Sequence, residues 1–300
     1  MPKLAYIEKK FHGETLRLIE TAEAICREYA AQGYIITLRQ LYYQFVARGY
    51  LPNRQTEYKR LGGIVNDARL AGLIDWSHME DRTRNLRSLS HWAGPESILR
   101  IVADQYREDK WNDQEYRPEV WIEKDALAGV IEVVCNQLDV PFFSCRGYTS
   151  QSEMWSAGQR LRSYRRNGQT PVVLHLGDHD PSGIDMSRDI TDRLELFTGR
   201  ELRFERLALN MNQVQQYAPP PNPAKTTDSR YDAYIQLYGD ESWELDALDP
   251  PVLAQLITDA IMAVRDEGLW AEAEEREAEK KEQLQSLSDR WGEVEAWLGS

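Results

Sequence analysis

The sequence predicts a mainly helical α/β protein of two domains, in which a helical domain precedes a Rossmann-like domain with a parallel sheet. Two short apolar runs, 120–122 and 172–176, each end in acidic residues and are each followed by a helical pattern. Further strands are expected at 141–145 and 202–209, so that strands alternate with helices as in parallel sheets. The polar, aperiodic segment 111–119 is expected to link the two domains.

The length and the charge distribution limit the possible functions. Three hundred residues suffice for two domains with separate cores, which we expect at 1–110 and 111–265, followed by an acidic tail, helical or disordered, at 266–300. From Asp228 onward the chain has 19 acidic and 6 basic residues, so this part carries the whole net charge of −13. The first 227 residues are neutral, and the net charge therefore does not exclude nucleic acid as a partner.

Neither a membrane nor a disulfide framework is expected. No apolar run approaches the roughly 18 residues of a membrane span, and the N-terminus lacks the apolar core of a signal peptide. We expect a cytoplasmic protein, associated with the nucleoid or, if encoded by a phage, in the host cytoplasm. Cys26, Cys135 and Cys145 form no CxxC pair, so they are expected to be small buried hydrophobic residues.

Three carboxylates follow the two apolar runs that are predicted to form strands. Asp180 precedes Pro181, so helix capping alone would explain it, but capping leaves Asp178 unexplained. Because parallel strands open on the same edge of a sheet, Glu123 can lie beside both aspartates. Hard oxygen ligands suit magnesium, so the pattern predicts Mg²⁺ bound by Glu123, Asp178 and Asp180. The alternative for Glu123 is a solvated pair with Lys124 at a loop.

A predicted helix near the N-terminus gives two adjacent tyrosines different positions around its axis. Thr37 is expected to cap this helix, whose apolar residues lie on one face: Leu38, Leu41, Tyr42, Phe45 and Val46. At about 100° per residue, Tyr42 falls within this face and Tyr43 at its flank, one turn from Arg39. We therefore expect Tyr42 in the core and the Tyr43 hydroxyl presented beside a cation. The alternative is that the Tyr43 ring only covers the edge of the core.

The next helix, roughly 56–71, is expected to contact DNA. It carries Lys59, Arg60 and Arg69, and the segment 73–76 could start a hairpin or wing. Helix, turn, helix and strand with basic residues is the arrangement of winged-helix DNA readers, so a duplex is the expected ligand. The basic surface would be extended by Arg82, Arg84 and Arg87.

These motifs together resemble a known family. A glutamate after one strand and a DxD after a later one resemble the Toprim domain. The segments GDHDPSG and IEK are similar to the A subunit of the type IIB topoisomerases (topoisomerase VI) and to its meiotic relative that makes double-strand breaks. That family has a winged-helix domain before its Toprim domain, with its nucleophile in an R-x-x-Y-Y motif. The resemblance covers roughly residues 35–250 and implies Tyr43 as the nucleophile, with Tyr42 as the fallback.

The resemblance extends to a block near the C-terminus. ELDAL is similar to a glutamate-x-x-Ala-Leu block of that subunit and maps Glu244 onto a family position, whereas Trp243 and Asp246 depart from the pattern. The alternative is a helix start with acids near its positive end. The proline-rich loop 218–228 could cross the site, and its Lys225 is a candidate phosphate or metal contact.

The predicted function is a DNA-cleaving transesterase that resembles a short phage or bacterial topoisomerase VI A subunit. Tyr43 would form a phosphotyrosyl-DNA intermediate with magnesium assistance. Ionising a phenol of pKa about 10 near pH 7 costs roughly 4 kcal/mol, so Arg39 or the metal has to lower that cost, and Lys124 could contact the same phosphate.

The resemblance also implies partners. In that family the tyrosine and the metal site come from different protomers, which implies a homodimer. The chain has no P-loop, so either a separate ATPase subunit exists or the enzyme is ATP-independent. The alternatives are a Toprim metal-dependent nuclease that uses activated water, and a non-catalytic DNA-binding recombination or defence factor.

Overall fold

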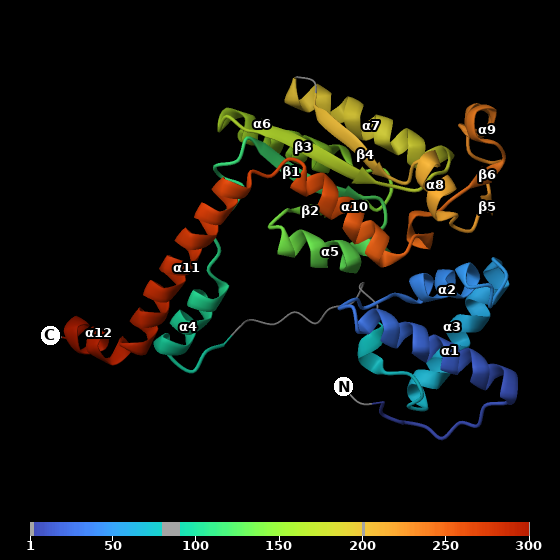
Figure 1. The fold of residues 1–300 in the computed structure, drawn as a ribbon, viewed down its shortest axis with the longest axis horizontal. Helices are drawn as coiled ribbons and strands as arrows, with labels where there is room; N and C mark the ends of the chain where they lie inside the picture. Colours follow the sequence, from blue (N-terminus) through green and yellow to red (C-terminus); the bar gives the residue numbers. More distant parts are fainter. Residues whose placement is uncertain (1–2, 80–90, 200–201, 300) are drawn as a thin grey trace.

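The computed structural model of the chain describes residues 3–79, 91–199 and 202–299. A four-stranded sheet in the order β2-β1-β3-β4 forms its centre, and most of the remaining described chain is helical (Figure 1). The strands are β1 (Tyr116–Ile122), β2 (Phe142–Ser144), β3 (Thr170–Leu176) and β4 (Arg203–Ala208). All three neighbouring pairs are parallel, so the predicted parallel α/β sheet is confirmed.

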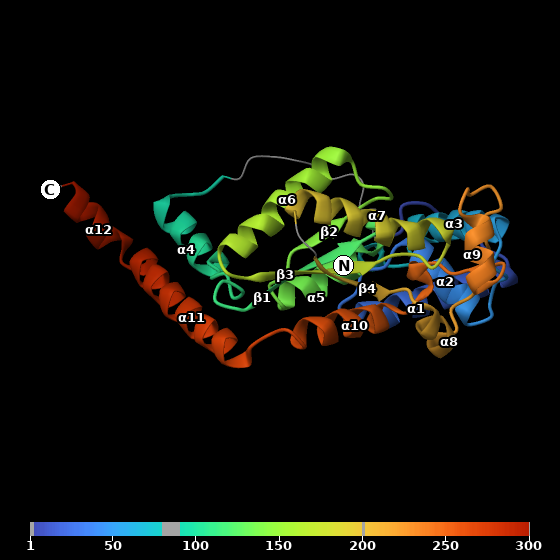
Figure 2. The same cartoon turned by 90° about the horizontal axis from the view of Figure 1, so that it is seen from above.

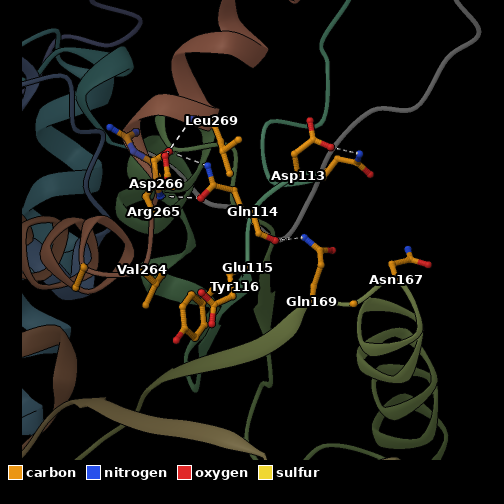
Figure 3. Close-up of a pocket in the computed structure, with 13 residues that line it drawn as sticks. Asp113, Gln114, Glu115, Tyr116, Asn167, Gln169, Val264, Arg265, Asp266 and Leu269 are labelled. Carbon is orange, nitrogen blue, oxygen red and sulfur yellow. Dashed lines mark hydrogen bonds between the residues drawn. The ribbon is translucent and has the colours of Figure 1, made fainter.

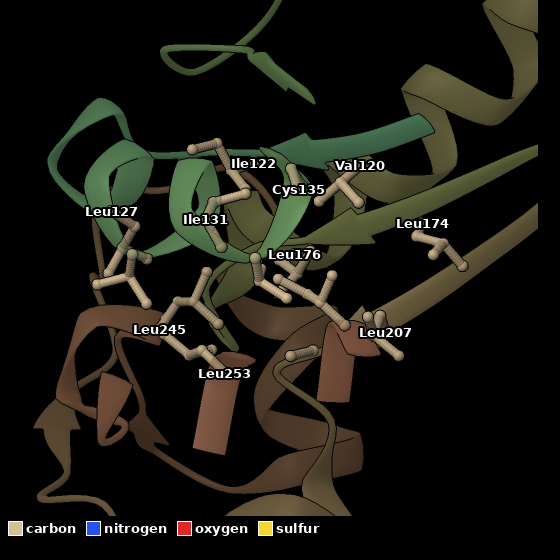
Figure 4. Packing of buried hydrophobic residues seen from close by; sticks show 14 of the residues in the cluster. Val120, Ile122, Leu127, Ile131, Cys135, Leu174, Leu176, Leu207, Leu245 and Leu253 are labelled. Atoms are coloured by element: carbon tan, nitrogen blue, oxygen red, sulfur yellow. The ribbon is translucent and has the colours of Figure 1, made fainter. Parts of the chain in front are cut away.

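Helices cover both faces of this sheet. On one side lie α6 (Gln151–Arg166) and α7 (Pro181–Thr198), and on the other α5 (Ala128–Gln137) and α10 (Pro250–Met262) (Figure 2). Successive strand residues face opposite sides, so Trp121 packs with α6 and α7 whereas Ile122 packs with α5 and α10. In this second core Leu176 packs with Leu245 and Leu253 from the C-terminal part of the chain (Figure 4). A sheet buried on both faces explains why its strands read as continuous apolar runs.

The N-terminal helices form a separate core. They are α1 (Gly13–Ala30), α2 (Leu38–Ala47) and α3 (Gln55–Leu70), and their buried residues include Ile25, Leu41, Phe45 and Leu61. As predicted, Thr37 caps α2: its hydroxyl accepts a hydrogen bond from the Gln40 backbone N–H at 3.3 Å, and the Gln40 side chain accepts one from the Thr37 N–H at 2.8 Å.

The expected hairpin at residues 73–76 is not formed. A 3-10 turn, η1 (Trp76–His78), stands there instead, because Asp75 caps it through the Ser77 backbone N–H and Arg69 holds the carbonyl oxygens of Trp76 and Met79. The predicted basic residues Arg82, Arg84 and Arg87 lie outside the described residues.

The expected linker at 111–119 is wrong. Trp111 is fully buried against Trp270, with ring centroids 5.7 Å apart, and β1 already begins at Tyr116. The strand tolerates Glu119 because the Arg160 guanidinium and the Trp121 indole N–H both bind its carboxylate. Pairing with β3 thus overrides the local polarity of the segment.

The C-terminal helices extend away from the sheet as an arm (Figures 1 and 2). The described part of the acidic tail is helical, with α11 (Glu267–Asp289) and α12 (Trp291–Leu298), and α4 (Pro95–Gln105) packs along α11. The Ser288 hydroxyl donates to the Glu96 carbonyl at 3.0 Å. The helix α4, which the predicted limits place in the first domain, therefore packs against the tail.

Several small elements complete the described chain. They are η2 (Asp125–Leu127), α8 (Met211–Tyr217), β5 (Asn222–Pro223), α9 (Tyr231–Tyr238), β6 (Glu241–Ser242) and η3 (Leu245–Ala247). The three cysteines are free and buried, as predicted. Within the described ranges no helix is both long and apolar enough to cross a membrane.

Candidate active site at the carboxyl edge of the sheet

The three predicted acidic residues meet at one edge of the sheet. Glu123 follows β1 and Asp178 follows β3, and the Asp178 backbone N–H donates to Oε2 of Glu123 at 2.9 Å. Asp180 caps α7, since its Oδ1 accepts hydrogen bonds from the Gly183 N–H at 2.6 Å and the Ser182 hydroxyl at 3.1 Å. Gly177 makes this approach possible, because a Cβ at that position would lie 2.9 Å from Oε2 of Glu123.

Burial makes it costly to ionise the carboxyl groups at this edge. Burial first, and the Asp178 carboxylate second, raise the pKa of Glu123 to about 7. Burial also raises the pKa of Asp178, against the Lys124 ammonium, which lowers it. Carboxyl groups with such perturbed pKa values are typical of functional sites.

Lys124 supplies a cation inside the acidic edge. Its Nζ lies 2.7 Å from Oδ2 of Asp178, 2.8 Å from Glu244 and 3.4 Å from Asp246. Burial lowers the pKa of Lys124, but the carboxylates of Asp246 and Asp178 more than offset this, so the pKa is raised. Lys124 therefore stays charged, and the alternative of a solvated pair with Glu123 is wrong.

Glu244 and Asp246 reach the site through a backbone pair. The N–H of His179 donates to the Trp243 carbonyl at 2.8 Å, and the N–H of Trp243 donates back at 2.9 Å. The following residues then lie beside Asp178, whose Oδ1 accepts a hydrogen bond from the Leu245 N–H at 2.8 Å. Asp246, which departs from the family pattern, is almost fully buried and was not predicted as a site residue.

The two adjacent tyrosines have different surroundings. Tyr42 belongs to the helical core, as predicted, and its hydroxyl contacts the carbonyls of Pro52 and Arg54 and accepts from the Arg54 N–H at 2.7 Å. Tyr43 lies outside that core, with the Arg39 guanidinium 5.9 Å from its ring centre. Tyr43 lies beside a cation, as expected, but the residue is largely buried, with only 5% of it exposed.

Opposing charges act on the Tyr43 hydroxyl. Burial and the Asp246 carboxylate raise its pKa, whereas Arg39, a hydrogen bond from the Asn222 side chain and Lys124 lower it. The net pKa is raised, so Tyr43 is neutral near pH 7. Both cations named by the sequence analysis, Arg39 and Lys124, thus act on the predicted nucleophile.

The proline-rich loop 218–228 lies beside Tyr43 at Asn222, a residue that the sequence did not indicate. The Asn53 amide donates to Oδ1 of Asn222 at 2.7 Å and to the Pro221 carbonyl at 3.3 Å. Asn222 also lines a cavity of about 270 Å³ next to Tyr43. Lys225 of the same loop is exposed, and no ion pair joins it to the acidic edge in the described part of the chain.

Arg206 at the end of β4 holds the aspartate loop. Its guanidinium donates to the carbonyl oxygens of Gly177, Asp178, Gly183 and Leu209 at 2.5–3.3 Å and to the Ser187 hydroxyl. Burial lowers the pKa of Arg206, while the nearby carboxylates raise it. Sequence spacing did not identify Arg206 as a site residue, because only the strand order of the sheet brings β4 beside the aspartate loop.

The residues at this edge suit a divalent cation in charge and in donor chemistry. Five carboxylates, of Glu123, Asp178, Asp180, Glu244 and Asp246, face the three cations Arg39, Lys124 and Arg206, which leaves two excess negative charges if all are ionised. Among the described residues nothing binds Oε1 of Glu123 or Oδ2 of Asp180. No three acidic, His or Cys side chains of the described ranges are already arranged as metal ligands. The oxygen donors are of the type that magnesium prefers, but they are not gathered as one ligand set, and Lys124 occupies one side of Asp178.

The three predicted DNA-binding residues are not equivalent. Lys59 is exposed on α3, whereas Arg60 is paired with Glu14 at 2.9 Å and Glu57 at 3.2 Å. Arg69 stacks on Trp76, with its guanidinium carbon 4.4 Å from the ring centre. Arg69 thus has a structural role in η1, and whether it also contacts DNA stays a prediction.

A second cavity, of about 690 Å³, lies at the opposite, amino edge of the sheet (Figure 3). Its polar side chains hold the chain together: the Gln114 side chain binds the backbone of Asp266 in both directions, at 2.9 and 2.7 Å, and Gln169 donates to the Gln114 carbonyl at 3.0 Å. We interpret this region as the anchor of the junction between α10 and α11.

The perturbed carboxylates, the two cations and the tyrosine therefore lie at the carboxyl edge, where parallel sheets bind their ligands. The elements that bring them there are the ends of β1, β3 and β4, the segment 243–246 and α2. Comparisons of the chain with protein-family models, with curated proteins and with solved structures find no match.

Proposed function

We propose that this protein is a DNA-cleaving transesterase with Tyr43 as its nucleophile, related to the topoisomerase VI A subunit with a winged-helix-like domain before a Toprim-like sheet. One observation carries the proposal. Tyr43 lines one cavity with Arg39, Asn222 and Glu244, and the charges of Arg39, Lys124 and Asp246 act on the pKa of its hydroxyl, at the sheet edge that bears the acidic residues. Nucleophile, cations and carboxylates thus come together within one chain.

The chain's own residues account for the step at phosphorus. Oη of Tyr43 bonds to the phosphorus while the bond from phosphorus to one deoxyribose oxygen breaks. The phenol proton leaves to solvent, and the released deoxyribose oxygen takes up a proton. Arg39 and Lys124 stabilise the phenolate and the phosphate charge, which offsets the burial and the Asp246 carboxylate that disfavour ionisation.

Magnesium is part of the proposal. Glu123, Asp178 and Asp180 would hold it, and when bound it supplies a positive charge next to the reacting phosphate. Its charge also matches the excess of carboxylates at this edge. In the same arrangement the Lys124 ammonium lowers the pKa of Asp178, against the burial that raises it, and lies 2.7 Å from its Oδ2.

The proposed partners follow from the same site. Duplex DNA would contact the exposed Lys59 and Arg60 on α3, close to the helix that carries Tyr43. A homodimer would be needed to cut both strands. The enzyme would act either with a separate ATPase subunit or independently of ATP. Arg39 of the tyrosine helix contacts the acidic edge of the same chain, whereas the resemblance implies that the tyrosine and the metal site come from different protomers. The proposed location is the cytoplasm, at the nucleoid or in a phage host.

The experiment is to stop the reaction with denaturant and to look for DNA covalently bound to the protein. The wild-type protein should yield an adduct that maps to Tyr43, and Tyr43→Phe should yield neither adduct nor cleavage. Tyr50→Phe is the control, since Tyr50 is exposed and does not line this cavity, and it should cleave normally. Free 5′- or 3′-phosphate ends without any adduct would show a metal-dependent nuclease instead.

Tyr42→Phe tests which of the adjacent tyrosines reacts. Its hydroxyl has buried backbone partners, so this variant should lose about 1–3 kcal/mol of stability. At a temperature where it is folded it should still form the adduct. A folded Tyr42→Phe protein without adduct, beside an active Tyr43→Phe, would make Tyr42 the nucleophile.

A further inference from the structure

We propose that the cavity beside Tyr43 receives a single unpaired nucleotide, so that the strand attacked by Tyr43 is locally unpaired at the cleaved phosphate. This inference rests on the proposed function and names the substrate conformation of its site. Arg54, Tyr58 and Asn53 would contact this nucleotide.

The size of the cavity is the first argument for a single nucleotide. Its volume is about 270 Å³, close to the lower limit of pockets for small ligands, roughly 300 Å³. Such a space can hold one nucleotide but not a base pair with two backbones. Because Tyr43 is 5% exposed, a phosphate has to enter this cavity to meet its hydroxyl. Because the sugar and base would enter the cavity together with the phosphate, the nucleotide has to leave its stack and its base pair.

The charge of the lining favours an anion. Arg39 and Arg54 face one acidic residue, Glu244, so the lining has one net positive charge. Arg39 is bound to Glu244 and Asp246, whereas the Arg54 guanidinium is exposed and has no partner among the residues that the structure describes. Arg54 is therefore available for a phosphate oxygen.

The remaining lining suits a sugar and a base. Asn53 and Gln55 provide amides, and Tyr58 provides an aromatic ring that stands edge-to-face against Tyr42, with ring centres 5.4 Å apart. Aromatic rings bind bases by stacking, with little dependence on sequence. A fixed Tyr58 ring would thus accept any of the four bases.

The rim of the cavity is held in place before a ligand arrives. The Tyr42 hydroxyl binds the backbone N–H of Arg54 at 2.7 Å, and the Asn53 side chain is bound to Asn222 at 2.7 Å. A preorganised rim reduces the ordering cost of binding. This arrangement joins α2, the turn before α3 and the proline-rich loop around one opening.

The test measures DNA affinity in the Tyr43→Phe full-length protein, so that no cleavage interferes. The probes are a fluorescent duplex, the same duplex with a short mismatched bubble, and the single strand. We expect the bubble and the single strand to bind about tenfold more tightly than the paired duplex. Arg54→Gln and Tyr58→Ala should remove this preference.

A control variant and the contrary outcome complete the design. Arg48→Gln removes a cation of the same helical region that is paired with Glu28 outside the cavity, and it should leave the preference unchanged. Equal affinity for bubble and paired duplex, with no effect of Arg54→Gln, would overturn the inference. An adduct formed equally well on paired DNA by the Arg54→Gln variant of the otherwise wild-type protein would also overturn it and leave the transesterase standing. A preference for the bubble without any adduct would support the assignment of the cavity and contradict the transesterase activity.

Discussion

Nε of Arg39 lies 2.7 Å from Oδ2 of Asp246, and this ion pair joins α2 to η3 across more than 200 residues of sequence. The Asp246 side chain is fully buried, and Lys124 lies 3.4 Å from its other oxygen. A buried carboxylate is tolerated when it is paired, and it destabilises the fold when one partner is removed. The same contact places the Arg39 charge next to Tyr43.

Replacing Arg39 should shift the pH dependence of the reaction. The Arg39 charge lowers the pKa of Tyr43, so Arg39→Gln raises that pKa further, and less phenolate is present at any given pH. We expect the rate of adduct formation at pH 8 to fall at least about tenfold and the rate profile to move to higher pH. The rate should be measured from pH 6 to 10, with Arg39→Lys as a control that keeps the charge. An unchanged profile for Arg39→Gln would contradict this role.

Asp178→Asn should separate metal binding from folding. Asparagine keeps the shape and the acceptor for the Leu245 N–H, and Lys124 retains Glu244 and Asp246 as partners. We expect stability to change by no more than about 1 kcal/mol, with cleavage reduced at least about 100-fold. A thermal melt measures the stability, a cleavage assay the activity, and calorimetric titration the affinity for Mg²⁺.

A second variant controls for helix capping. Asparagine caps helices about as well as aspartate, so Asp180→Asn should keep α7 intact while removing one carboxylate from the predicted metal site. Both variants should bind Mg²⁺ more weakly than the wild type. Wild-type Mg²⁺ affinity and cleavage in both would refute the metal assignment.

Lys59 and Arg69 should differ in their effect on DNA binding. Lys59 is exposed, so Lys59→Gln should weaken duplex binding and lower the slope of log affinity against log salt by about 1. Arg69 binds two carbonyl oxygens of the η1 region, so Arg69→Gln should cost about 1–3 kcal/mol of stability without changing the slope. Salt titrations of both variants test this, and a lower slope for Arg69→Gln would restore Arg69 to the DNA-binding surface.

Glu277 should make the attachment of the arm sensitive to acid. Burial raises the pKa of Glu277, but hydrogen bonds from Lys110, Lys281 and the Glu108 N–H lower it to about 2. A folded-state pKa below the unfolded value contributes stability above about pH 4.5 and loses it as the pH falls toward 2.

The variant Glu277→Gln should therefore be less stable than the wild type at pH 7, by about 1–3 kcal/mol, with the difference shrinking below pH 4.5. Urea unfolding followed by tryptophan fluorescence at pH 7 and pH 3 measures the difference. Glu275→Gln, on the exposed side of the same helix, should behave like the wild type. A difference that grows toward pH 3 would disprove the assignment.

Local patterns in the sequence determined much of the fold. The apolar period predicted the strands of the sheet and the phase of α2, with Tyr42 in the core, and Asp180 before Pro181 predicted the start of α7. Parallel pairing of β1 and β3 brought Glu123 to Asp178, as their positions after two strands indicated. These features depend on residues within a few positions of each other, or on the common direction of strands in a parallel sheet.

The tertiary structure alone decided which distant residues complete the site. Asn222, Asp246 and Arg206 reach it from loops and strand ends whose positions depend on the sheet order and on the His179–Trp243 backbone pair. No local periodicity in the sequence predicts these contacts, because each contact joins segments that are far apart in the sequence. The burial of Tyr43 has the same origin: helix phase determines which side of α2 a residue occupies, but only the packing of other segments against that side decides whether it is exposed.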